Sequence, residues 1–571
     1  MKKLVIFALL LSVSTAAIAG GYSDKVKKIK SPKGTTLTGV VYCGDEPLAG
    51  VSVTDGREIV RTDKNGIYRI ASTKPYGLVY ISAPSGFAPT CEDGIMPQFW
   101  ASTTTPAKKC ERHDFELKKV DDKQFSIIFC SDSHFCNDSK RNDLHFFKTD
   151  HMAAVNKAFA DAKEHPVYTV CLGDVTWDRF WFETGFDLPQ VPKLLSECNY
   201  PTPVYAIMGN HDNDPSVPCG ENTDFIAENK WRETFGPTFY SVNIGDTHFV
   251  MLDNIVYKNT PSKPNAKKYA GVVGTRNYDA YIVPSQLEWL KKDLASVDKS
   301  TPIVICMHAP LRLRDANGEI YRGLKKGEGE KLIDAVKDFD CVRIFYGHKH
   351  QSHYFEIDGC PNITETSVPS LAGELWSTGN RIGRNICDDG TEAGLLLCKF
   401  DGKTMTGKTF YGHRDGNMPM RLYDMNSVRL HYADSKDSAM LKHARELLPN
   451  QKDYSDAQYE NYVYINCWAC DAGTTIEASE DGKPLTIEQV KDCDPWAAIA
   501  IIAPGMKKRK KIEKRSNCVS LVDHMYRVKT ESATTPVTVA VKTPFGETYT
   551  QTLERPAEFP NFIARSAATR Q

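Results

Sequence analysis

The distribution of apolar and polar residues divides the chain into three regions. Between residues 35 and 120, short apolar runs such as 37–42 and 67–70 alternate with Gly, Asp and Asn turns, a pattern typical of short antiparallel strands. From about residue 124 to 415, apolar runs alternate with helical patterns, which indicates a layered α/β domain. Short alternating runs then return. We therefore expect a β-sandwich at 35–120, an α/β domain at 124–415 and a β-rich domain at 420–571.

Five continuous apolar runs in the central region predict buried strands. They lie at residues 125–130, 167–172, 204–208, 302–307 and 342–346. Between the first two, Met152, Val155 and Phe159 are spaced by three and four residues, which places them on one face of a helix. Strands that alternate with helices predict a layered α/β arrangement.

The composition is that of a packed globular protein. Of 571 residues, 41% are hydrophobic and 25% are charged, values that exclude disorder, collagen and coiled coil. Lys and Arg together number 71, against 72 Asp and Glu. Because there is no basic excess, nothing points to a nucleic acid partner or to an acidic membrane surface.

The first residues predict export. The chain opens with Met-Lys-Lys, residues 4–13 are almost wholly apolar, and residues 17–19 (Ala-Ile-Ala) supply a small-x-small cleavage site. These are the parts of a secretory signal peptide, and its apolar stretch is too short to span a bilayer. No later segment approaches the ~20 apolar residues of a membrane helix. We expect removal of residues 1–19 and a periplasmic, secreted or cell-surface protein without a membrane span.

The 17 cysteines do not by themselves indicate a disulfide scaffold, since their number is odd and the chain is large. Several lie in apolar runs and resemble buried small hydrophobic residues. Two pairs of loop cysteines are candidates for disulfide bonds, Cys91 with Cys110 and Cys360 with Cys387, but the sequence does not fix the connectivity. The motif Cys-Trp-Ala-Cys at 467–470 is a lone C-x-x-C. Without a second pair, we interpret it as strand residues rather than as a zinc or redox motif.

Polar side chains of the kinds that bind metals follow each of the five predicted strands. A lone His, or Asp after Gly, is by itself uninformative, but five successive strand ends of this kind are not a chance pattern. In open α/β sheets, ligands bind outside the carboxyl ends of the strands, so we expect these side chains at one edge of the fold. In strand order they are Asp132 and His134, then Asp174, Asn210, His308, and His348 with His350.

The ordered series D-x-H, G-D, G-N-H-D, H and G-H-x-H over residues 124–355 resembles the calcineurin-like metallophosphoesterase superfamily. The resemblance implies a four-layered α/β/β/α sandwich with a binuclear metal centre. Residues 35–120 are similar to the carboxypeptidase-regulatory-like β-sandwich, and both flanking β domains resemble those of some exported bacterial members. The expected fold class is therefore an α/β metallophosphoesterase sandwich flanked by two β-rich domains.

The resemblance also implies a role for each residue. It assigns Asp132, His134 and His350 to one metal ion, Asn210, His308 and His348 to the other, and Asp174 to a bridge between them. Carboxylate, imidazole and amide oxygen suit two divalent or transition metal ions such as Mn, Fe or Zn, and the absence of thiolate argues against a structural zinc site. His211 would stabilise or protonate the leaving-group oxygen, and Asp212 would orient the His211 ring. Asp178 either braces a ligand or caps the next helix.

The implied reaction is hydrolysis of a phosphomonoester or phosphodiester by attack of metal-bound hydroxide, and the motifs do not separate the two. We expect a phosphorylated small molecule, glycan or lipid headgroup as substrate. Several aromatic residues lie near strand ends and form either a stacking wall for the substrate or packing at a domain interface. They are Trp177, Phe180, Trp181, Phe182 and Trp376. The alternative function is a surface glycan-binding protein with an inert phosphoesterase-like domain.

Overall fold

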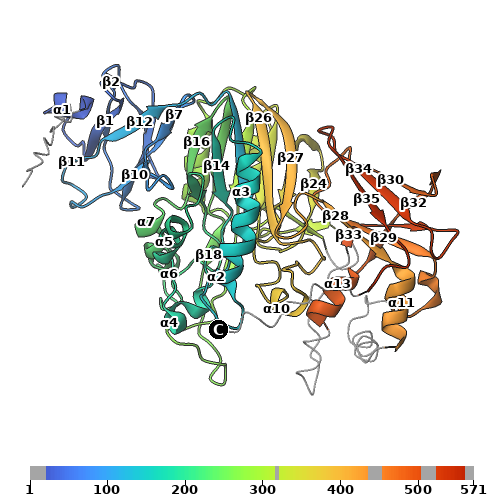
Figure 1. Ribbon diagram of the computed structural model, residues 1–571. Helices are drawn as coiled ribbons and strands as arrows, with labels where there is room; N and C mark the ends of the chain where they lie inside the picture. Colours follow the sequence, from blue (N-terminus) through green and yellow to red (C-terminus); the bar gives the residue numbers. More distant parts are fainter. Residues whose placement is uncertain (1–20, 315–319, 435–452, 503–521, 560–571) are drawn as a thin grey trace, which may run out of the picture.

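The computed structural model describes residues 21–314, 320–434, 453–502 and 522–559. The predicted signal peptide lies outside these residues. Figure 1 shows three regions in chain order: a β domain in blue, an α/β domain in green to yellow, and a second β domain in orange to red. The predicted sequence of a β-rich, an α/β and a β-rich region is thus present.

The N-terminal domain packs two sheets around a shared core that contains Val41, Val53 and Ile81. One sheet holds β1 (Leu37–Cys43), β2 (Glu46–Pro47), β5 (Ile67–Ile70), β7 (Phe87–Pro89), β11 (Glu111–Arg112) and β12 (Phe115–Lys119), and the other holds β3 (Ser52–Thr54), β4 (Ile59–Arg61), β6 (Leu78–Ser82) and β10 (Trp100–Ser102). Most neighbours are antiparallel, as predicted, but β1 runs parallel to β11 and β12. The long connection between these strands permits the parallel pairing.

Two sheets also form the centre of the α/β domain. The first has the order β15-β14-β13-β26-β27 and the second β16-β17-β20-β23-β25-β24. Their bounds are β13 (Gln124–Cys130), β14 (Val167–Cys171), β15 (Val204–Ala206), β16 (Tyr240–Ile244), β17 (Thr247–Met251), β20 (Ile303–Met307), β23 (Val342–Tyr346), β24 (Tyr354–Ile357), β25 (Cys360–Ser367), β26 (Gly394–Asp401) and β27 (Thr404–Gly412). The five predicted strands are all present: β13, β14 and β15 run parallel to one another in the first sheet, and β20 and β23 run parallel in the second. The sheets touch face to face, since the ring centroids of Phe129 and Phe345 are 4.1 Å apart.

Helices cover the outer face of each sheet, and Figure 1 shows α3 lying over the first one. On the first sheet, Val155 and Val191 pack in one apolar cluster with the strands; on the second, Leu290 and Val336 do the same. The helices are α2 (Asp143–Phe146), α3 (Met152–Ala160) and α5 (Gln190–Glu197) on the first sheet, and α8 (Pro284–Leu294) and α9 (Glu328–Val336) on the second. The order helix, sheet, sheet, helix confirms the four-layered α/β/β/α sandwich.

Shorter elements lie in the connections. They are α1 (Tyr22–Lys25), β8 (Cys91–Glu92), β9 (Met96–Pro97), α4 (Trp181–Thr184), α6 (Thr223–Ala227), α7 (Asn229–Thr234), β18 (Ile255–Tyr257), β19 (Tyr278–Ala280), β21 (Arg312–Arg314), β22 (Ile320–Arg322) and α10 (Gly379–Ile382). The pair β18 and β19 brackets residues 258–277, a long connection whose last residues reach the candidate site described below.

The C-terminal domain again packs two four-stranded sheets, with Val463, Val528 and Val539 buried in their common cluster. One sheet holds β28 (Met420–Asp424), β29 (Tyr462–Cys467), β32 (Ile487–Asp492) and β33 (Val522–Lys529), and the other holds β30 (Thr475–Glu480), β31 (Lys483–Pro484), β34 (Val537–Lys542) and β35 (Thr548–Leu553). The helices here are α11 (Met425–Asp434) and α13 (Pro495–Ala497). The prediction of a β-rich C-terminal region is confirmed.

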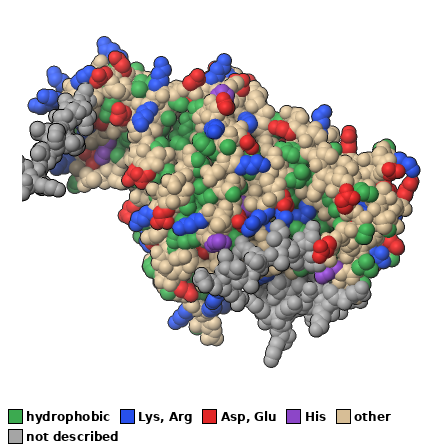
Figure 2. Space-filling model, in the orientation of Figure 1, with side chains coloured by type: hydrophobic (Ala, Val, Ile, Leu, Met, Phe, Trp, Pro, Cys, Tyr) green, Lys and Arg blue, Asp and Glu red, His purple; other side chains and the backbone are tan. Residues whose placement is uncertain are grey.

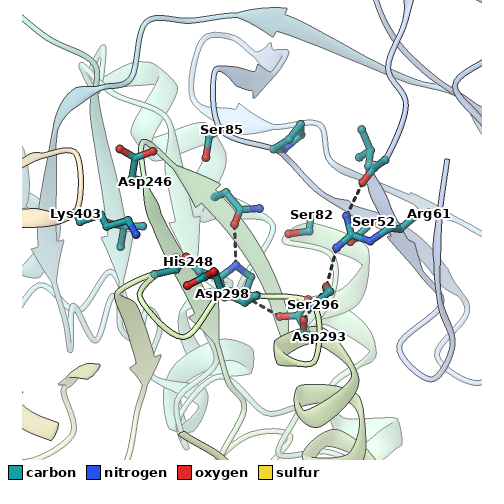
Figure 3. Close-up of a pocket in the computed structure, with 17 residues that line it drawn as sticks. Ser52, Arg61, Ser82, Ser85, Asp246, His248, Asp293, Ser296, Asp298 and Lys403 are labelled. Carbon is teal, nitrogen blue, oxygen red and sulfur yellow. Dashed lines mark hydrogen bonds and ion pairs between the residues drawn. The ribbon is translucent and has the colours of Figure 1, made fainter. Parts of the chain in front are cut away.

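A polar cavity of about 340 Å³ lies between the N-terminal domain and the α/β domain (Figure 3). Arg61 of β4 donates a hydrogen bond to the Ser296 hydroxyl at 2.6 Å, across the domain boundary. His248 of β17 lies between Asn243 Oδ1, at 2.8 Å, and Asp293 Oδ2, at 2.9 Å. Because His248 is near the amino end of β17, this cavity lies away from the sheet edge where the candidate ligands gather.

The described cysteines are all free, so neither pair considered from the sequence, Cys91 with Cys110 or Cys360 with Cys387, is bonded. In Figure 2, acidic and basic side chains are interspersed over the visible face, as the near-equal numbers of the two charges suggest. Among the described helices, none combines the length and the apolar character that a membrane crossing requires.

Candidate metal centre and active site

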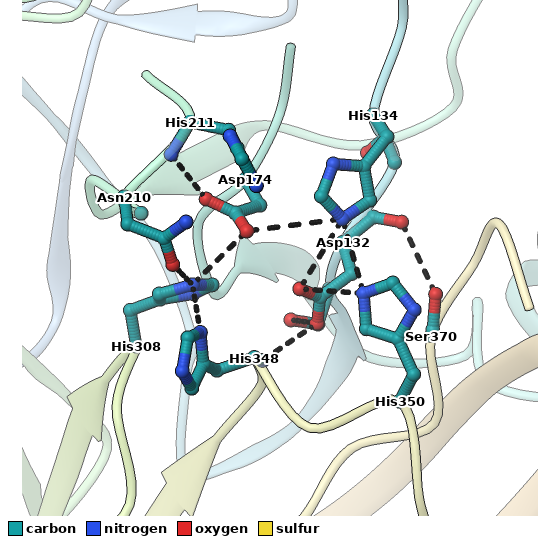
Figure 4. Close-up of polar contacts among 12 residues, drawn as sticks. Asp132, His134, Asp174, Asn210, His211, His308, His348, His350 and Ser370 are labelled. Carbon is teal, nitrogen blue, oxygen red and sulfur yellow. Dashed lines mark hydrogen bonds and ion pairs between the residues drawn. The ribbon is translucent and has the colours of Figure 1, made fainter. Parts of the chain in front are cut away.

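The residues that follow the five parallel strands converge at one edge of the two sheets (Figure 4). Each comes within four residues of the strand that delivers it. Five of them have φ between +46° and +71°, in the left-handed region: Asp132, His134, Asp174, His348 and His350. Such conformations are uncommon for residues other than Gly and cost roughly 1–3 kcal/mol each, and they cluster at functional sites. The strand ends turn sharply enough to aim these side chains at a common point.

Asp132, His134 and His350 form the first cluster. The Nε2 atoms of His134 and His350 lie 3.0 Å apart, and Asp132 Oδ1 is 3.7 Å from the first and 3.3 Å from the second. Asp132 Oδ1 is buried and has no hydrogen-bond partner in the described part of the chain. A buried carboxylate oxygen of this kind needs a counter-charge, and three ligand atoms around one point fit a cation.

Asn210, His308 and His348 form the second cluster. His308 Nε2 is 3.2 Å from Asn210 Oδ1 and 3.2 Å from His348 Nδ1. The other ring nitrogen of His308, Nδ1, donates to the Leu172 carbonyl oxygen at 2.8 Å. That bond fixes the ring so that Nε2 keeps its lone pair, the arrangement found in metal-binding histidines.

Asp174 stands between the two clusters. Its Oδ2 atom is 3.7 Å from His134 Nε2 and 3.3 Å from His308 Nε2. Its Oδ1 atom accepts the backbone N–H of His211 at 2.7 Å, which fixes the carboxylate plane. A carboxylate in this position can touch a cation on either side, and the structure gathers the other six predicted ligands around it.

The electrostatics also fit cations. Burial lowers the pKa of His134 to about 4 and that of His348 to about 3, which keeps both rings neutral, as a metal ligand must be. Burial acts the same way on His308 and His350, but Asp174 and Asp132 outweigh it and raise each pKa to about 9. The two buried carboxylates thus attract positive charge, which bound cations supply.

His211 lies beside this centre, and its ring orientation is set by a carboxylate. His211 Nδ1 donates to Asp178 Oδ1 at 2.8 Å. The same oxygen accepts from the Arg276 guanidinium at 2.6 Å. Asp178 is fully buried and caps no helix through its side chain. The structure therefore shows neither of the two alternatives for Asp178: its side chain caps no helix, and it braces the His211 ring rather than a proposed metal ligand.

The prediction that Asp212 orients the His211 ring is wrong. The Asp212 carboxylate accepts backbone N–H groups from Val175 at 3.2 Å, Thr176 at 2.9 Å and Gly209 at 2.9 Å. It therefore ties the loop after β14 to the loop after β15. The sequence signal for the correct acid was weak, since Asp178 is marked only by its place four residues after Asp174.

Sequence reasoning missed three groups at the site. Arg276 comes from the connection between β18 and β19, and Tyr278 from β19 places its hydroxyl 3.1 Å from His348 Nε2. Arg179 lies on the ring of Tyr269, with 4.0 Å from Cζ to the ring centroid. The same guanidinium lies 5.8 Å from the ring centroid of Trp177, and within the described residues no carboxylate forms an ion pair with it.

The aromatic residues considered as a stacking wall divide into two groups. Trp177 borders the centre, with ring centroids 5.9 Å from His134 and 6.2 Å from His211. Trp181 and Trp376 are buried in the apolar core of the first sheet, so they are core residues of the α/β domain. Trp376 also supports the site, because its Nε1 donates to the Ser133 carbonyl oxygen at 2.7 Å.

Three family models match the chain. The N terminal of calcineurin-like phosphoesterase matches residues 35–120, calcineurin-like phosphoesterase matches 125–352, and the C terminal of calcineurin-like phosphoesterase matches 365–549. A comparison with curated protein sequences finds no match.

Solved structures show more distant similarity. A dimetal phosphatase from Danio rerio is 13% identical, with a TM-score of 0.31 over 51% of this chain and 99% of that one. A purple acid phosphatase from yellow lupin (Lupinus luteus) seeds is 11% identical, with a TM-score of 0.34 over 64% and 68%. A putative 5′-nucleotidase from Staphylococcus aureus is 14% identical, with a TM-score of 0.29 over 48% and 51%.

Proposed function

Because the chain belongs to the calcineurin-like phosphoesterase family and is a metal-dependent phosphoric ester hydrolase, we propose that it is an exported enzyme with a binuclear centre. Its substrate is a phosphomonoester or phosphodiester of a small molecule, a glycan or a lipid headgroup. The observation that carries the proposal is the position of Asp174, within 3.7 Å of a ligand nitrogen from each cluster.

The proposed ligands divide as the two clusters do. Asp132, His134 and His350 hold one ion, Asn210, His308 and His348 hold the other, and Asp174 contributes to both. The donor set of carboxylate, imidazole and amide oxygen supports Mn, Fe or Zn. Two such ions supply Lewis acidity toward the phosphoryl oxygens and lower the pKa of bound water.

The chain's own contribution to bond cleavage is assigned to His211. Its Nδ1 donates to Asp178, so Nε2 is the ring atom left to meet the departing oxygen. Burial lowers the pKa of His211, but Asp174 and Asp178 outweigh burial and raise it above its ordinary value, which favours a ring that carries a proton to donate. A positioned general acid typically contributes ~10²–10⁴-fold.

Substrate selection is assigned to the side of the centre that carries His211. Arg179, which lies next to Asp178 in the chain, offers N–H donors to a phosphate or another anionic group. Trp177 supplies an apolar wall beside the same imidazole. These groups support a substrate whose leaving portion is itself polar or charged, as in a phosphorylated sugar or headgroup.

Export rests on the N-terminal sequence, with its basic start, apolar stretch and small-x-small site. The test is N-terminal sequencing of protein recovered from separated periplasmic, membrane and culture fractions. We expect a first residue at or near Gly20 in an exported fraction. Cytoplasmic protein that keeps Met1 would refute this part of the proposal.

The enzymatic part is tested with bound-metal analysis and the hydrolysis of p-nitrophenyl phosphate and bis-p-nitrophenyl phosphate. We expect about two metal ions per chain, as in two-metal sites, and loss of activity on chelation that added metal restores. A panel of phosphorylated glycans, nucleotides and lipid headgroups then identifies the substrate. Active protein without metal would refute the binuclear centre. Metal-free, inactive protein that binds glycans would favour the inert alternative.

A further inference from the structure

The C-x-x-C motif that follows β29 forms a close pair of sulfur atoms. Cys467 Sγ and Cys470 Sγ are 3.1 Å apart, and Cys470 Sγ also donates to the Cys467 carbonyl oxygen at 3.1 Å. A disulfide needs a separation of about 2.05 Å, so the two sulfurs have to approach by about 1 Å to form one. The sequence interpretation as plain strand residues fits Cys467, the last residue of β29. It does not fit Cys470, which lies in the turn beyond.

The two thiols differ in environment. Cys467 is fully buried, whereas Cys470 is partly exposed. The hydrogen bond with Cys467, together with the positive charges of His524 and Lys408, lowers the pKa of the Cys470 thiol. A partly exposed thiol whose pKa is lowered beside cations is the arrangement of a reactive cysteine, and Cys467 Sγ, 3.1 Å away, is the second thiol.

The same turn joins the C-terminal domain to the α/β domain. The Ala469 N–H donates to the Ser352 hydroxyl at 3.0 Å, and Asp471 forms an ion pair with Lys408 of β27. Trp468 is fully buried and packs against Phe410, with ring centroids 5.8 Å apart. Since Ser352 lies two residues after the proposed ligand His350, the turn is held close to the strand end that serves the metal centre.

We propose that Cys467 and Cys470 are a redox-active dithiol that exchanges with an external disulfide, and that the resulting bond fixes the turn between the two domains. The Cys470 thiolate attacks one sulfur of the external disulfide, which forms a mixed disulfide and releases one thiolate. Cys467 then attacks Cys470 Sγ and passes its proton to the departing sulfur, which releases the second half of the external disulfide as a thiol. The external disulfide is reduced by two electrons, and the chain's two thiols are oxidised. Neither step uses the phosphoesterase site.

The test is differential alkylation of the full-length folded protein after incubation with glutathione disulfide or with dithiothreitol. Cleavage after Lys452 and Lys491 releases residues 453–491, which contain Cys467 and Cys470 and no other cysteine. We expect this peptide to lack two hydrogens and to carry no alkyl group after glutathione disulfide. After subsequent treatment with dithiothreitol and unfolding, we expect the peptide to carry two alkyl groups. In the Cys470→Ser variant, we expect Cys467 to be either a mixed disulfide with glutathione or an unreacted thiol.

The chain contains a matched control pair. Cys130 and Cys171 lie opposite each other on β13 and β14 and are both buried, so they should stay reduced under the same treatment. Two alkylated cysteines in residues 453–491 after glutathione disulfide would overturn the proposal. A bond that dithiothreitol cannot reduce in the folded protein would also overturn it, because the pair would then be a fixed structural disulfide.

The claim that the bond between Cys467 and Cys470 fixes the turn is tested by thermal unfolding of the oxidised and the reduced protein. We expect the oxidised wild type to unfold about 2–4 °C above the reduced protein, and the Cys467→Ser and Cys470→Ser variants to show no difference. An unchanged midpoint in a protein that mass spectrometry shows to be oxidised would overturn the claim that the bond fixes the turn.

Discussion

His211 and Asp178 are joined twice although they are 33 positions apart: His211 Nδ1 donates to Asp178 Oδ1 at 2.8 Å, and the Asp178 N–H donates to the His211 carbonyl oxygen at 3.1 Å. The backbone bond sets the distance between the two loops, and the side-chain bond sets the ring within it. Since a carboxylate only accepts, the Nδ1 atom carries a proton, and Nε2 is the ring nitrogen left for the proposed leaving-group role.

Replacement of His211 by Ala should distinguish good leaving groups from poor ones. An alkoxide needs its charge neutralised as it departs, whereas p-nitrophenolate, a far weaker base, barely does. We expect a ~10²–10⁴-fold loss of kcat/KM on alkyl phosphoesters, a distinctly smaller loss on p-nitrophenyl esters, and unchanged metal content. An equal loss on both substrate types with metals intact would instead assign His211 to phosphate binding.

The Asp178→Asn and Asp212→Asn variants should behave differently. Asp178→Asn weakens the hold on the ring, so we expect a smaller version of the His211→Ala pattern, with the larger loss on alkyl phosphoesters. Asp212 contacts backbone N–H groups and not the ring, so Asp212→Asn should lower the unfolding midpoint without any dependence on leaving group. If Asp212→Asn instead showed the larger loss on alkyl phosphoesters and Asp178→Asn showed no dependence on leaving group, Asp212 would be the residue that orients the His211 ring.

Removal of the Asp174 side chain should empty both proposed metal positions together. Its Oδ2 atom faces His134 and His308, one from each cluster, so Asp174→Ala leaves each with one ligand fewer and removes the charge between them. Metal content after gel filtration is the measurement, and His211→Ala is the control that keeps its metals. Retention of one full equivalent by Asp174→Ala would show that the two positions are independent.

Trp376→Phe should destabilise the α/β domain. Trp376 is fully buried, and its Nε1 donates to the Ser133 carbonyl oxygen at 2.7 Å, between Asp132 and His134. Loss of this bond leaves a buried carbonyl without its partner, which costs about 1–3 kcal/mol. The measurement is the urea midpoint, with the exposed Phe182→Leu as a control that should change it little. Equal midpoints for both variants would contradict a structural role for the indole.

A buried ion pair in the N-terminal domain predicts a pH dependence of stability away from the metal centre. Burial raises the pKa of Glu111, but the hydrogen bonds from Lys74 and Thr104 outweigh burial and lower it from 4.5 to about 2. A carboxyl group whose pKa is lowered in the folded state stabilises that state above pH 4.5, and this contribution to the free energy of unfolding is lost as the pH falls toward 2. We expect Glu111→Gln to cost on the order of 2 kcal/mol at pH 7.

The check is the difference in unfolding free energy between wild type and Glu111→Gln at pH 7, 4 and 3. The difference should shrink as the pH falls, since protonation removes the same charge that the substitution removes. Glu116→Gln, at an exposed position on β12, is the control and should show little difference at any pH. A Glu111→Gln difference that is constant with pH would mean that the ion pair contributes no linked stability.

The order of the elements and the positions of the proposed ligands could be predicted from the sequence. Apolar runs mark buried strands because both faces of each strand are covered, and the residues after parallel strands must meet at one edge. Asp132, Asp174 and His308 were therefore recognisable from their places after such runs. The helix at Met152–Ala160 followed from the spacing of Met152 and Val155, which are both buried.

Only the tertiary structure decided which loop groups touch one another. Asp212 is next to His211 in the chain, whereas Asp178 is 33 positions away. Because the loops after β14 and β15 lie side by side, it is Asp178 that bonds to the His211 ring. Arg276 is 65 positions from His211, and Ala469 is 117 positions from the Ser352 hydroxyl that it meets. Periodicity encodes which face of an element is buried, because that depends on neighbours in the chain. Contacts between loops depend on how whole layers pack, and no local pattern records that.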